Sequence, residues 1–330
     1  MNLLPNAEQE QLADTVRAVL EKRFPVRRLL GDGRGRPSPE EWRELAELGW
    51  FGLGLGVDAG GAGGSSAEEM LAFVEFGTSL LSGPVLGTVL GAHAAALAGD
   101  NDTANAIATG EAQVGLFVDS DSGGYVIDGT DAPVVLAISE YECQLIDVTD
   151  ITVVDRIDCI DTAVDLQSVH LEPADAKLTV TGEVASRLYL RGAVLAAAFQ
   201  VGSAQATLAQ SLQYAKDRYQ FGQPIGGFQA IKHRCADMAI QAEAAWSITA
   251  LAALSIDDDL ERAQLLAASA KAVADRVARS SAATNVQNHG GIGYTWDYGA
   301  HLFVSRAEVF GELLQPTQRA LRNVYASPVS

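Results

Sequence analysis

The sequence predicts an α+β fold that is mainly α, arranged in three parts along its 330 residues. Apolar residues recur with the period of an α-helix through residues 1–112 and again through 183–330, whereas residues 113–182 hold short β-branched runs. We therefore expect an N-terminal helical domain (1–112), a small middle β domain (113–182) and a C-terminal four-helix-type bundle (183–330).

The N-terminal part carries start signals of helices. One helical stripe begins after Pro5-Asn6 and comprises Leu12, Val16, Val19 and Arg23. Two capping boxes, Ser38-Pro39-Glu40-Glu41 and Ser66-Ala67-Glu68-Glu69, predict the first turns of two further helices. The glycine-rich residues 60–64 follow no predicted strand and lack the lysine of a P-loop, so we expect a connecting loop there.

The middle part is predicted to be β because short runs of Val, Ile and Leu alternate with acidic and glycine-containing turns. These runs cover residues 114–118, 134–138, 144–148, 151–154 and 163–171, and the predicted β domain ends near Val180.

Long helices are predicted from residue 183 onward, since apolar residues again recur every three or four positions. Three faces are visible: Val194, Ala198, Val201, Gln205, Leu208 and Leu212; Ile231, Cys235, Met238, Ala242 and Ala245; and Leu266, Ala270, Val273 and Val277. Because the connections are short, we expect these helices to pack as antiparallel neighbours in a bundle.

The charge balance is strongly acidic and uneven. The chain holds 23 Lys and Arg against 42 Asp and Glu, a net charge of −19, which argues against nucleic-acid binding and against an anionic membrane surface. Residues 113–180 hold 2 basic and 14 acidic residues, whereas residues 181–330 hold 13 and 12. A phosphate-bearing ligand should therefore prefer the bundle to the β domain.

Cysteine use and hydropathy indicate a cytoplasmic protein. Cys143, Cys159 and Cys235 are far apart and have no disulfide or metal spacing, which favours a reducing compartment. We expect no signal peptide, because the first residues lack a basic and a long apolar stretch. The most apolar stretch, residues 83–99, is too short and too rich in glycine to span a bilayer.

Neither a metal site nor hydrolase chemistry is predicted. No nucleophile-elbow serine appears, and the histidines show no metal spacing. The five histidines are His93, His170, His233, His289 and His301.

Two segments of the predicted bundle could carry chemistry. Residues 217–225 place Arg218 at a helix end, followed by Phe221 and a Gly-x-Pro turn. One interpretation is structural: Arg218 caps the helix dipole and Phe221 fills the core. Residues 287–294 (Gln-Asn-His-Gly-Gly-Ile-Gly-Tyr) are either a glycine cap with a turn or a place where a ligand's phosphate or adenine approaches the backbone.

In this order on a helical bundle, the two segments resemble those of the acyl-CoA dehydrogenase family, and the resemblance spans nearly the whole chain. Its sharpest parts are Arg218-x-x-Phe221-Gly222 followed by residues 228–233, and Gln287-x-x-Gly290-Gly291-x-Gly293-Tyr294. The resemblance implies an FAD shared across a subunit interface. Its pyrophosphate would meet Arg218, its adenosine half would be lined by Gln287, Gly290 and Gly291, and Phe221 belongs to the same motif. A fixed guanidinium suits a pyrophosphate.

The sequence departs from the family pattern where chemistry is expected. It lacks the Thr-Glu-Pro-x-x-Gly-Ser-Asp type stretch and the Trp-x-Thr strand that hold the isoalloxazine in the family, and residues 116–124 read Leu-Phe-Val-Asp-Ser-Asp-Ser-Gly-Gly instead. The family's catalytic Glu has two alternative positions, which fall here on Gly192 and Leu314, and neither residue is a base. Glu308 and Glu312 lie nearby on a predicted helix, as surface charges or, for Glu312, as a displaced base.

The resemblance therefore points to the smaller, degenerate subunit of a heteromeric (α2β2) bacterial acyl-CoA dehydrogenase. It implies a longer partner subunit that supplies base and flavin platform, an acyl-CoA substrate such as a steroid side-chain CoA thioester, and an electron-transfer flavoprotein or similar acceptor. We expect the chain alone to bind FAD weakly or not at all. Two alternatives stay open: a self-sufficient homodimer with a displaced base, which the missing Glu disfavours, and a non-catalytic acyl-CoA-binding or assembly protein, which the retained Arg218 and Gln287 disfavour.

Overall fold

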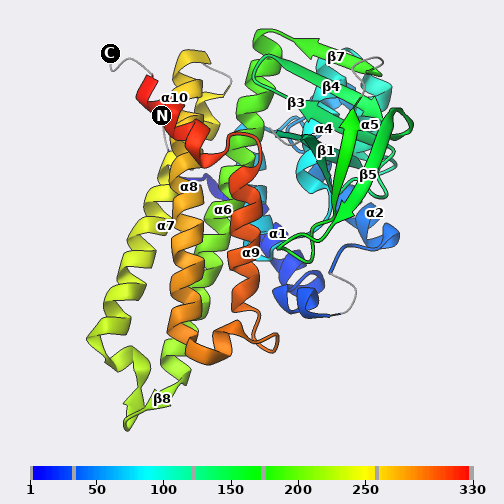
Figure 1. Ribbon diagram of the computed structural model, residues 1–330. Helices are drawn as coiled ribbons and strands as arrows, with labels where there is room; N and C mark the ends of the chain where they lie inside the picture. The colour runs from blue at the N-terminus through cyan, green and yellow to red at the C-terminus, as the bar shows by residue number, and fades with distance from the viewer. Residues whose placement is uncertain (1–2, 32–34, 121–122, 172–175, 257–259, 327–330) are drawn as a thin grey trace.

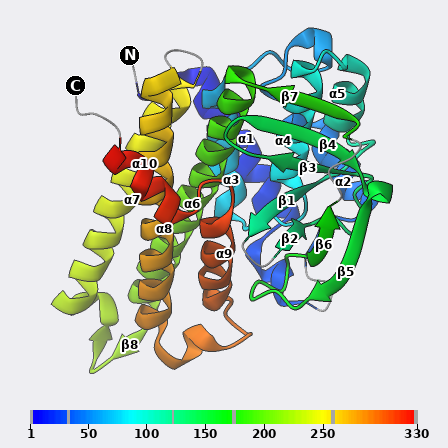
Figure 2. The ribbon, with the colours of Figure 1, turned by 45° about the horizontal axis from the view of Figure 1, so that its top comes forward.

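The protein consists of an N-terminal group of helices, a β-sheet and a C-terminal helical bundle, as predicted (Figure 1). The computed structural model describes residues 3–31, 35–120, 123–171, 176–256 and 260–326. In both views the sheet lies to one side of the bundle (Figures 1 and 2).

The N-terminal helices begin at capping residues that the sequence largely identifies. Asn6 and Ser38 each form a capping box, Ser38 with Glu41. The predicted box that begins at Ser66 is one residue too late. The N-cap is Ser65, paired with Glu68, because Ser66 is already helical and Glu69 turns into the core. The helices are α1 (Ala7–Arg23), α2 (Pro39–Glu47), α3 (Ser66–Thr78), α4 (Val85–Leu97) and α5 (Asn101–Ala108), with short 3-10 turns at Val26–Leu30, Trp50–Gly52 and Val57–Ala59.

The middle part is a seven-stranded mixed sheet in the order β5-β6-β2-β1-β3-β4-β7. Neighbouring strands are antiparallel except β1 and β3, which are parallel. The sequence did not predict β2, because its short glycine-containing run resembled a turn. The strands are β1 (Val114–Ser120), β2 (Gly123–Ile127), β3 (Val134–Ile138), β4 (Glu142–Asp147), β5 (Ile151–Ile157), β6 (Leu166–Leu171) and β7 (Leu178–Thr181); a 3-10 turn covers Val148–Asp150. Residues 121–122 of the 116–124 stretch lie outside the described residues.

The C-terminal part is the predicted bundle of long helices (Figure 1). Its helices are α6 (Glu183–Asp217), α7 (Gln229–Ser255), α8 (Leu260–His289), α9 (Ala300–Glu312) and α10 (Thr317–Ala326). The predicted apolar faces are buried over most of their length, but Leu212, at the end of the first face, is 41% exposed. The hairpin β8 (Tyr219–Gln220) and β9 (Gln223–Pro224) and the 3-10 turns Ile225–Gly227 and Gly290–Tyr294 connect the helices.

Helix α6 is the central element of the fold, since it packs against α8 in the bundle and against α3 of the N-terminal part. Gly202 and Gly77 allow α6 and α3 to pack closely. A Cβ on Gly202 would collide with the Val74 carbonyl, and a Cβ on Gly77 would collide with the Phe199 carbonyl. Among the described helices, α6 is also the one with the length and hydropathy of a membrane span. However, 78% of the apolar 18-residue stretch of α6 that could cross a membrane is buried inside the protein, so α6 is a core helix.

Candidate functional site

The first of the two predicted cofactor segments lies at the lower end of the bundle, where α6 stops (Figure 1). Arg218 is the C-cap of α6, and its side chain is exposed. Phe221 and Gly222 form the tip of the β8–β9 hairpin, both with positive φ, a combination typical of a type I′ turn. Phe221 is 93% exposed, so the interpretation that it fills the core is wrong. A phenylalanine at φ 52° on a hairpin tip is an unusual conformation, of the kind found at functional sites.

The second predicted segment follows the end of α8. Gln287 is exposed in the last turn of α8, and Gly290 and Gly291 are exposed in the 3-10 turn that follows. Gly290 has a φ of +65°, which accounts for a glycine there. Gly291 does not have a positive φ, and a Cβ on it would meet no atom of the described residues within 4 Å. Intramolecular packing therefore gives no reason for a glycine at 291.

Polar and ring contacts fix the ends of α6 and α8 to one another. Ser211 Oγ donates to Asn285 Oδ1 over 2.8 Å, and the Tyr214 ring stacks on His289 with centroids 4.2 Å apart. Burial lowers the pKa of His289, which keeps its ring neutral within this stack. As a result, the five predicted cofactor residues gather at one end of the bundle.

Gly192 and Leu314, the two positions that the resemblance predicts for a catalytic Glu, lie side by side. A Cβ on Gly192 would lie 2.8 Å from Leu314 Cδ1 and equally close to Leu90 Cδ1. Leu314 itself has a φ of 58°, and its carbonyl accepts a hydrogen bond of 2.9 Å from the Tyr189 hydroxyl. Leucine side chains thus occupy the space that a side chain at position 192 would need.

Glu312, the candidate displaced base, lies in the last turn of α9. Its side chain is 69% exposed, and Arg279 Nη2 lies 3.5 Å from its Oε1. The same guanidinium donates to Glu308 through Nε over 2.9 Å. Both carboxylates therefore belong to one surface ion-pair cluster around Arg279.

A buried ion-pair cluster that the sequence did not reveal lies beside Gly192. Glu69 of α3 is 2% exposed; its Oε1 lies 2.7 Å from His93 Nε2, and its Oε2 pairs with Arg191. Burial raises the pKa of Glu69, but the charges of His93 and Arg191 outweigh burial and lower the pKa to about 2. A general base works best with a pKa near the working pH, so Glu69 is poorly suited to proton abstraction.

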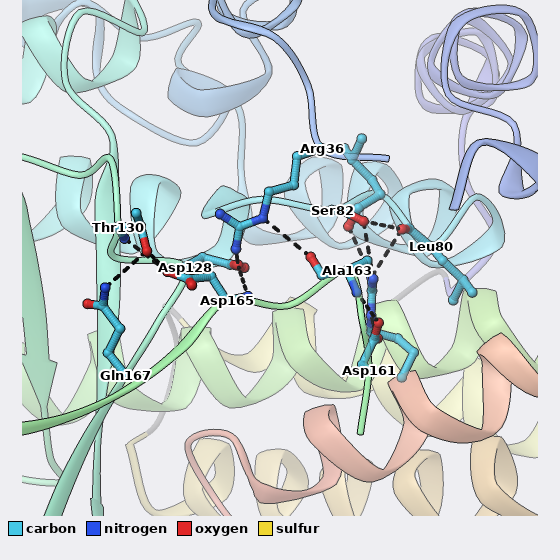
Figure 3. A network of polar contacts seen from close by, with 11 residues as sticks. Arg36, Leu80, Ser82, Asp128, Thr130, Asp161, Ala163, Asp165 and Gln167 are labelled. Carbon is cyan, nitrogen blue, oxygen red and sulfur yellow. Dashed lines mark hydrogen bonds and ion pairs between the residues drawn. The ribbon is translucent and has the colours of Figure 1, made fainter. Parts of the chain in front are cut away.

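The three parts of the molecule meet at a network of buried charges (Figure 3). Arg306 of α9, 1% exposed, pairs with Asp161 of the β part and donates to the Leu80 carbonyl and Ser82 Oγ after α3. Arg36, which precedes α2, pairs with Asp128 after β2. Burial raises the pKa of Asp128, and the Arg36 guanidinium opposes this shift. Both arginines thus tie the sheet to helical parts.

Little space remains inside this junction. Phe199 of α6 stacks on Phe310 of α9 with centroids 4.0 Å apart, and the Arg306 guanidinium lies over the Phe199 ring. The cavity that these residues line has a volume of about 40 Å³. Small-molecule sites usually measure roughly 300–1,000 Å³. This cavity is therefore too small for a flavin ring or an acyl chain.

Two family models match the chain. A model described as acyl-CoA dehydrogenase, N-terminal domain, matches residues 6–106. A model described as acyl-CoA dehydrogenase, C-terminal domain, matches residues 183–313. Together they cover the N-terminal helices and most of the bundle.

Individual proteins of this kind are similar over the whole length. The chain is 33% identical over 331 residues to acyl-CoA dehydrogenase IpdE2 of Mycobacterium tuberculosis, with 98% of each protein covered. Its fold matches a chain of the ChsE4-ChsE5 complex from Mycobacterium tuberculosis, with a TM-score of 0.84, 23% identity and complete coverage of both chains. It also matches a chain of a variant of the Tcur3481-Tcur3483 steroid ACAD, with a TM-score of 0.82, 23% identity and 96% coverage of each.

Proposed function

The chain belongs to the acyl-CoA dehydrogenase family, and from this we propose that it is one subunit of a heteromeric FAD-dependent acyl-CoA dehydrogenase, completing the FAD site of a longer partner subunit. The reaction is the α,β-dehydrogenation of an acyl-CoA thioester, in which the α-carbon loses a proton and the β-carbon loses a hydride. FAD, when bound, accepts that hydride. The partner supplies the base, and an electron-transfer flavoprotein or similar acceptor removes the electrons.

The observation that carries the proposal is the contact between Gly192 and Leu314. Both positions for a base are apolar and touch each other, whereas the residues of the cofactor motifs are retained and exposed. A chain that binds cofactor but cannot take a proton is what one half of a shared site requires. The family resemblance supplies the role of each position, and the packing supports the loss of the base.

The exposed bundle end fits the diphosphate and adenosine half of FAD. The Arg218 guanidinium can bind two phosphate oxygens at once, and the Gln287 amide can donate to and accept from an adenosine. The missing side chain at Gly291 leaves room for a close approach to the backbone. These residues would hold and orient the cofactor, and none of them would move a proton.

The sheet of this chain does not fit the isoalloxazine half. Its strands carry neither of the family's flavin-holding stretches, and residues 113–180 hold 14 acidic against 2 basic residues. We therefore assign the flavin ring to the partner subunit.

The relatives support a proposal for the substrate class. One solved structure of the same fold belongs to a steroid ACAD, and another is the ChsE4-ChsE5 complex. We propose a CoA thioester of a steroid side chain as the substrate, and a longer acyl-CoA dehydrogenase chain, encoded next to this one, as the partner.

The flavin content of the purified protein tests the proposal. We expect the chain alone to carry little flavin. The complex co-expressed with the longer partner should carry stoichiometric flavin, and it should oxidise an acyl-CoA when a dye serves as electron acceptor. Stoichiometric flavin in the chain alone would contradict the proposal and favour the homodimer.

Arg218→Ala in the complex tests the assigned position directly. A charge-assisted hydrogen bond contributes about 1.5–3 kcal/mol, so FAD affinity should fall roughly ten- to hundredfold, and dehydrogenation with it. Arg322→Ala is the matched control, because Arg322 is an exposed arginine on α10, at the opposite end of the bundle. If both variants keep flavin and rate, the role assigned to Arg218 is wrong.

A further inference from the structure

A second, larger cavity lies between the sheet and α9. Its volume is about 360 Å³, it is open to solvent, and it falls within the usual size range of small-molecule sites. Side chains from β1, β2, β6, the loop before β6 and α9 form its walls. The apolar side chains of its walls are Val118, Ile127, Ile160, Val164, Leu166, Val309 and Leu313.

The polar groups of this pocket set the charge of its ligand. Asp158, Glu308 and Glu312 lie among the lining residues, and Arg279 offsets part of the charge of the two glutamates. The surrounding sheet adds further acidic charge, since residues 113–180 carry 14 acids. A carboxylate, sulfate or phosphate on a ligand would be repelled at this position.

The pocket also offers few hydrogen-bond donors. Among its lining side chains, only the Tyr125 hydroxyl and the Cys159 thiol can donate. An isoalloxazine has several ring acceptors that need donors, and the diphosphate of FAD would approach the carboxylates. Apolar walls with isolated polar groups instead suit a rigid hydrocarbon that bears a single hydroxyl or ketone.

We propose that this pocket binds the uncharged ring system of a steroid. The lining and charge of the cavity favour a neutral and mostly apolar ligand, whereas the choice of a rigid steroid among such ligands rests on the proposed function. The steroid would lie against the sheet and α9, away from the exposed bundle end that carries Arg218 and Gln287. The pocket would thus recognise the part of a substrate or related ligand that is not joined to CoA.

Cys159 provides a site-specific probe of the pocket. It is partly exposed, and although burial raises the pKa of its thiol, the other two cysteines are better protected. Cys143 is fully buried with a pKa raised to about 12, and Cys235 is 6% exposed. A maleimide should therefore modify Cys159 first, and the Cys159→Ser variant should lose this fast reaction, as followed by mass spectrometry of the peptides.

Protection of Cys159 by a matched pair of steroids tests the proposal in the full-length chain. We expect saturating pregnenolone to slow modification of Cys159 at least tenfold, and the same concentration of pregnenolone sulfate, which adds only the anionic group, to protect little. Equal protection by both would overturn the charge argument. Protection by dodecanol equal to that by pregnenolone would overturn the steroid assignment, and protection by FAD in place of the steroid would identify a flavin site.

Variants of the pocket wall show whether protection arises there. Val118→Trp fills the pocket from β1 and should abolish protection, whereas Val153→Trp, on the same sheet but outside the pocket, should retain it. Ile160→Asp changes a 65% exposed residue of the wall, so it should weaken pregnenolone binding in equilibrium dialysis without disturbing the fold. Unchanged binding in both wall variants would overturn the proposal. The flavin content of the heteromer is measured separately and tests only the proposed function.

Discussion

Gly291 is a residue at which folding and cofactor binding can be separated. The backbone conformation at this position does not require a glycine, and a Cβ added there would meet no atom of the described residues within 4 Å. We predict that Gly291→Ala leaves the free energy of unfolding of the chain alone unchanged or raises it by up to about 1 kcal/mol. In the complex, the added methyl group should lower flavin content. Urea unfolding and flavin absorbance check the two parts, and full flavin retention would show that no ligand approaches Gly291.

Gln287 should contribute less to FAD binding than Arg218. A neutral hydrogen bond adds about 0.5–1.5 kcal/mol, so Gln287→Ala should lower FAD affinity in the complex roughly two- to tenfold. Titration of the apo-complex with FAD measures both variants on one scale. A loss larger than that of Arg218→Ala would contradict the assigned order.

Glu312 distinguishes the heteromer from the homodimer. We predict that Glu312→Gln in the complex retains dehydrogenation with the dye acceptor, because the partner supplies the base and Glu312 belongs to the surface cluster around Arg279. Glu308→Gln, which removes a charge from the same cluster, is the matched control. Loss of turnover with flavin retained, in Glu312→Gln alone, would place the base in this chain.

The sequence could identify motif residues but not their surroundings. Arg218, Gln287 and the glycines are recognisable from spacing, whereas the exposure of Phe221 depends on a hairpin that spacing does not reveal. The sequence predicts a capping box at Ser66, one residue too late, because the serine pair at 65–66 and the glutamate pair at 68–69 allow the same spacing twice. The inward turn of Glu69 becomes apparent only when His93 and Arg191 lie beside it.

At the scale of elements, the long helices were predictable because each repeats an apolar face over many turns. Strand β2 was not, since it is short and its pairing with β1 and β6 is decided by distant residues. The packing of α3 against α6 could not be predicted from the sequence either. It depends on two glycines, Gly77 and Gly202, whose role appears only when the helices are in contact.

The α3–α6 crossing should tolerate no added side chain. We predict that Gly202→Ala lowers the free energy of unfolding by about 1–3 kcal/mol or more, because its methyl group would meet the Val74 backbone carbonyl, which cannot move alone. Gly192→Ala is the matched control: it lies in the same helix, but its methyl group would meet the flexible ends of Leu314 and Leu90. Urea unfolding of both variants isolates packing, since the gain in helix propensity is the same. Equal stability of the two variants would contradict this account.

For the whole molecule, the order of helical, β and helical parts was predictable, but the contacts that join them were not. Arg306–Asp161 and Arg36–Asp128 link residues far apart in sequence (Figure 3). The buried charges of Arg306, Asp161 and Asp128 are tolerable only beside their partners. The Glu69 cluster joins the N-terminal helices α3 and α4 to α6 in the same way. A sequence shows such residues as ordinary surface charges.

The Glu69 cluster makes the stability of the whole molecule depend on pH. Its folded pKa of about 2 lies below the ordinary value of 4.5, so the ionised cluster stabilises the fold above about pH 4.5. This contribution to the free energy of unfolding is lost as pH falls from about 4.5 towards 2. Since one pKa unit corresponds to about 1.36 kcal/mol, the contribution is on the order of 3 kcal/mol. We therefore predict that Glu69→Gln is clearly less stable than the wild type at pH 7, and that the difference narrows at pH 3.

Comparison of the wild type with Glu69→Gln separates the contribution of Glu69 from those of the other buried acids. Burial raises the pKa values of Glu75, Asp128 and Asp275, so their contributions change with pH in the opposite direction. These residues are present in both proteins, so their effects cancel in the difference between the free energies of unfolding. Urea titrations from pH 7 to pH 3 measure that difference, with Glu312→Gln as an exposed carboxylate whose effect should stay small throughout. A difference for Glu69→Gln that is constant with pH would mean that the side chain contributes by shape and hydrogen bonding, and that its charge does not hold α3, α4 and α6 together.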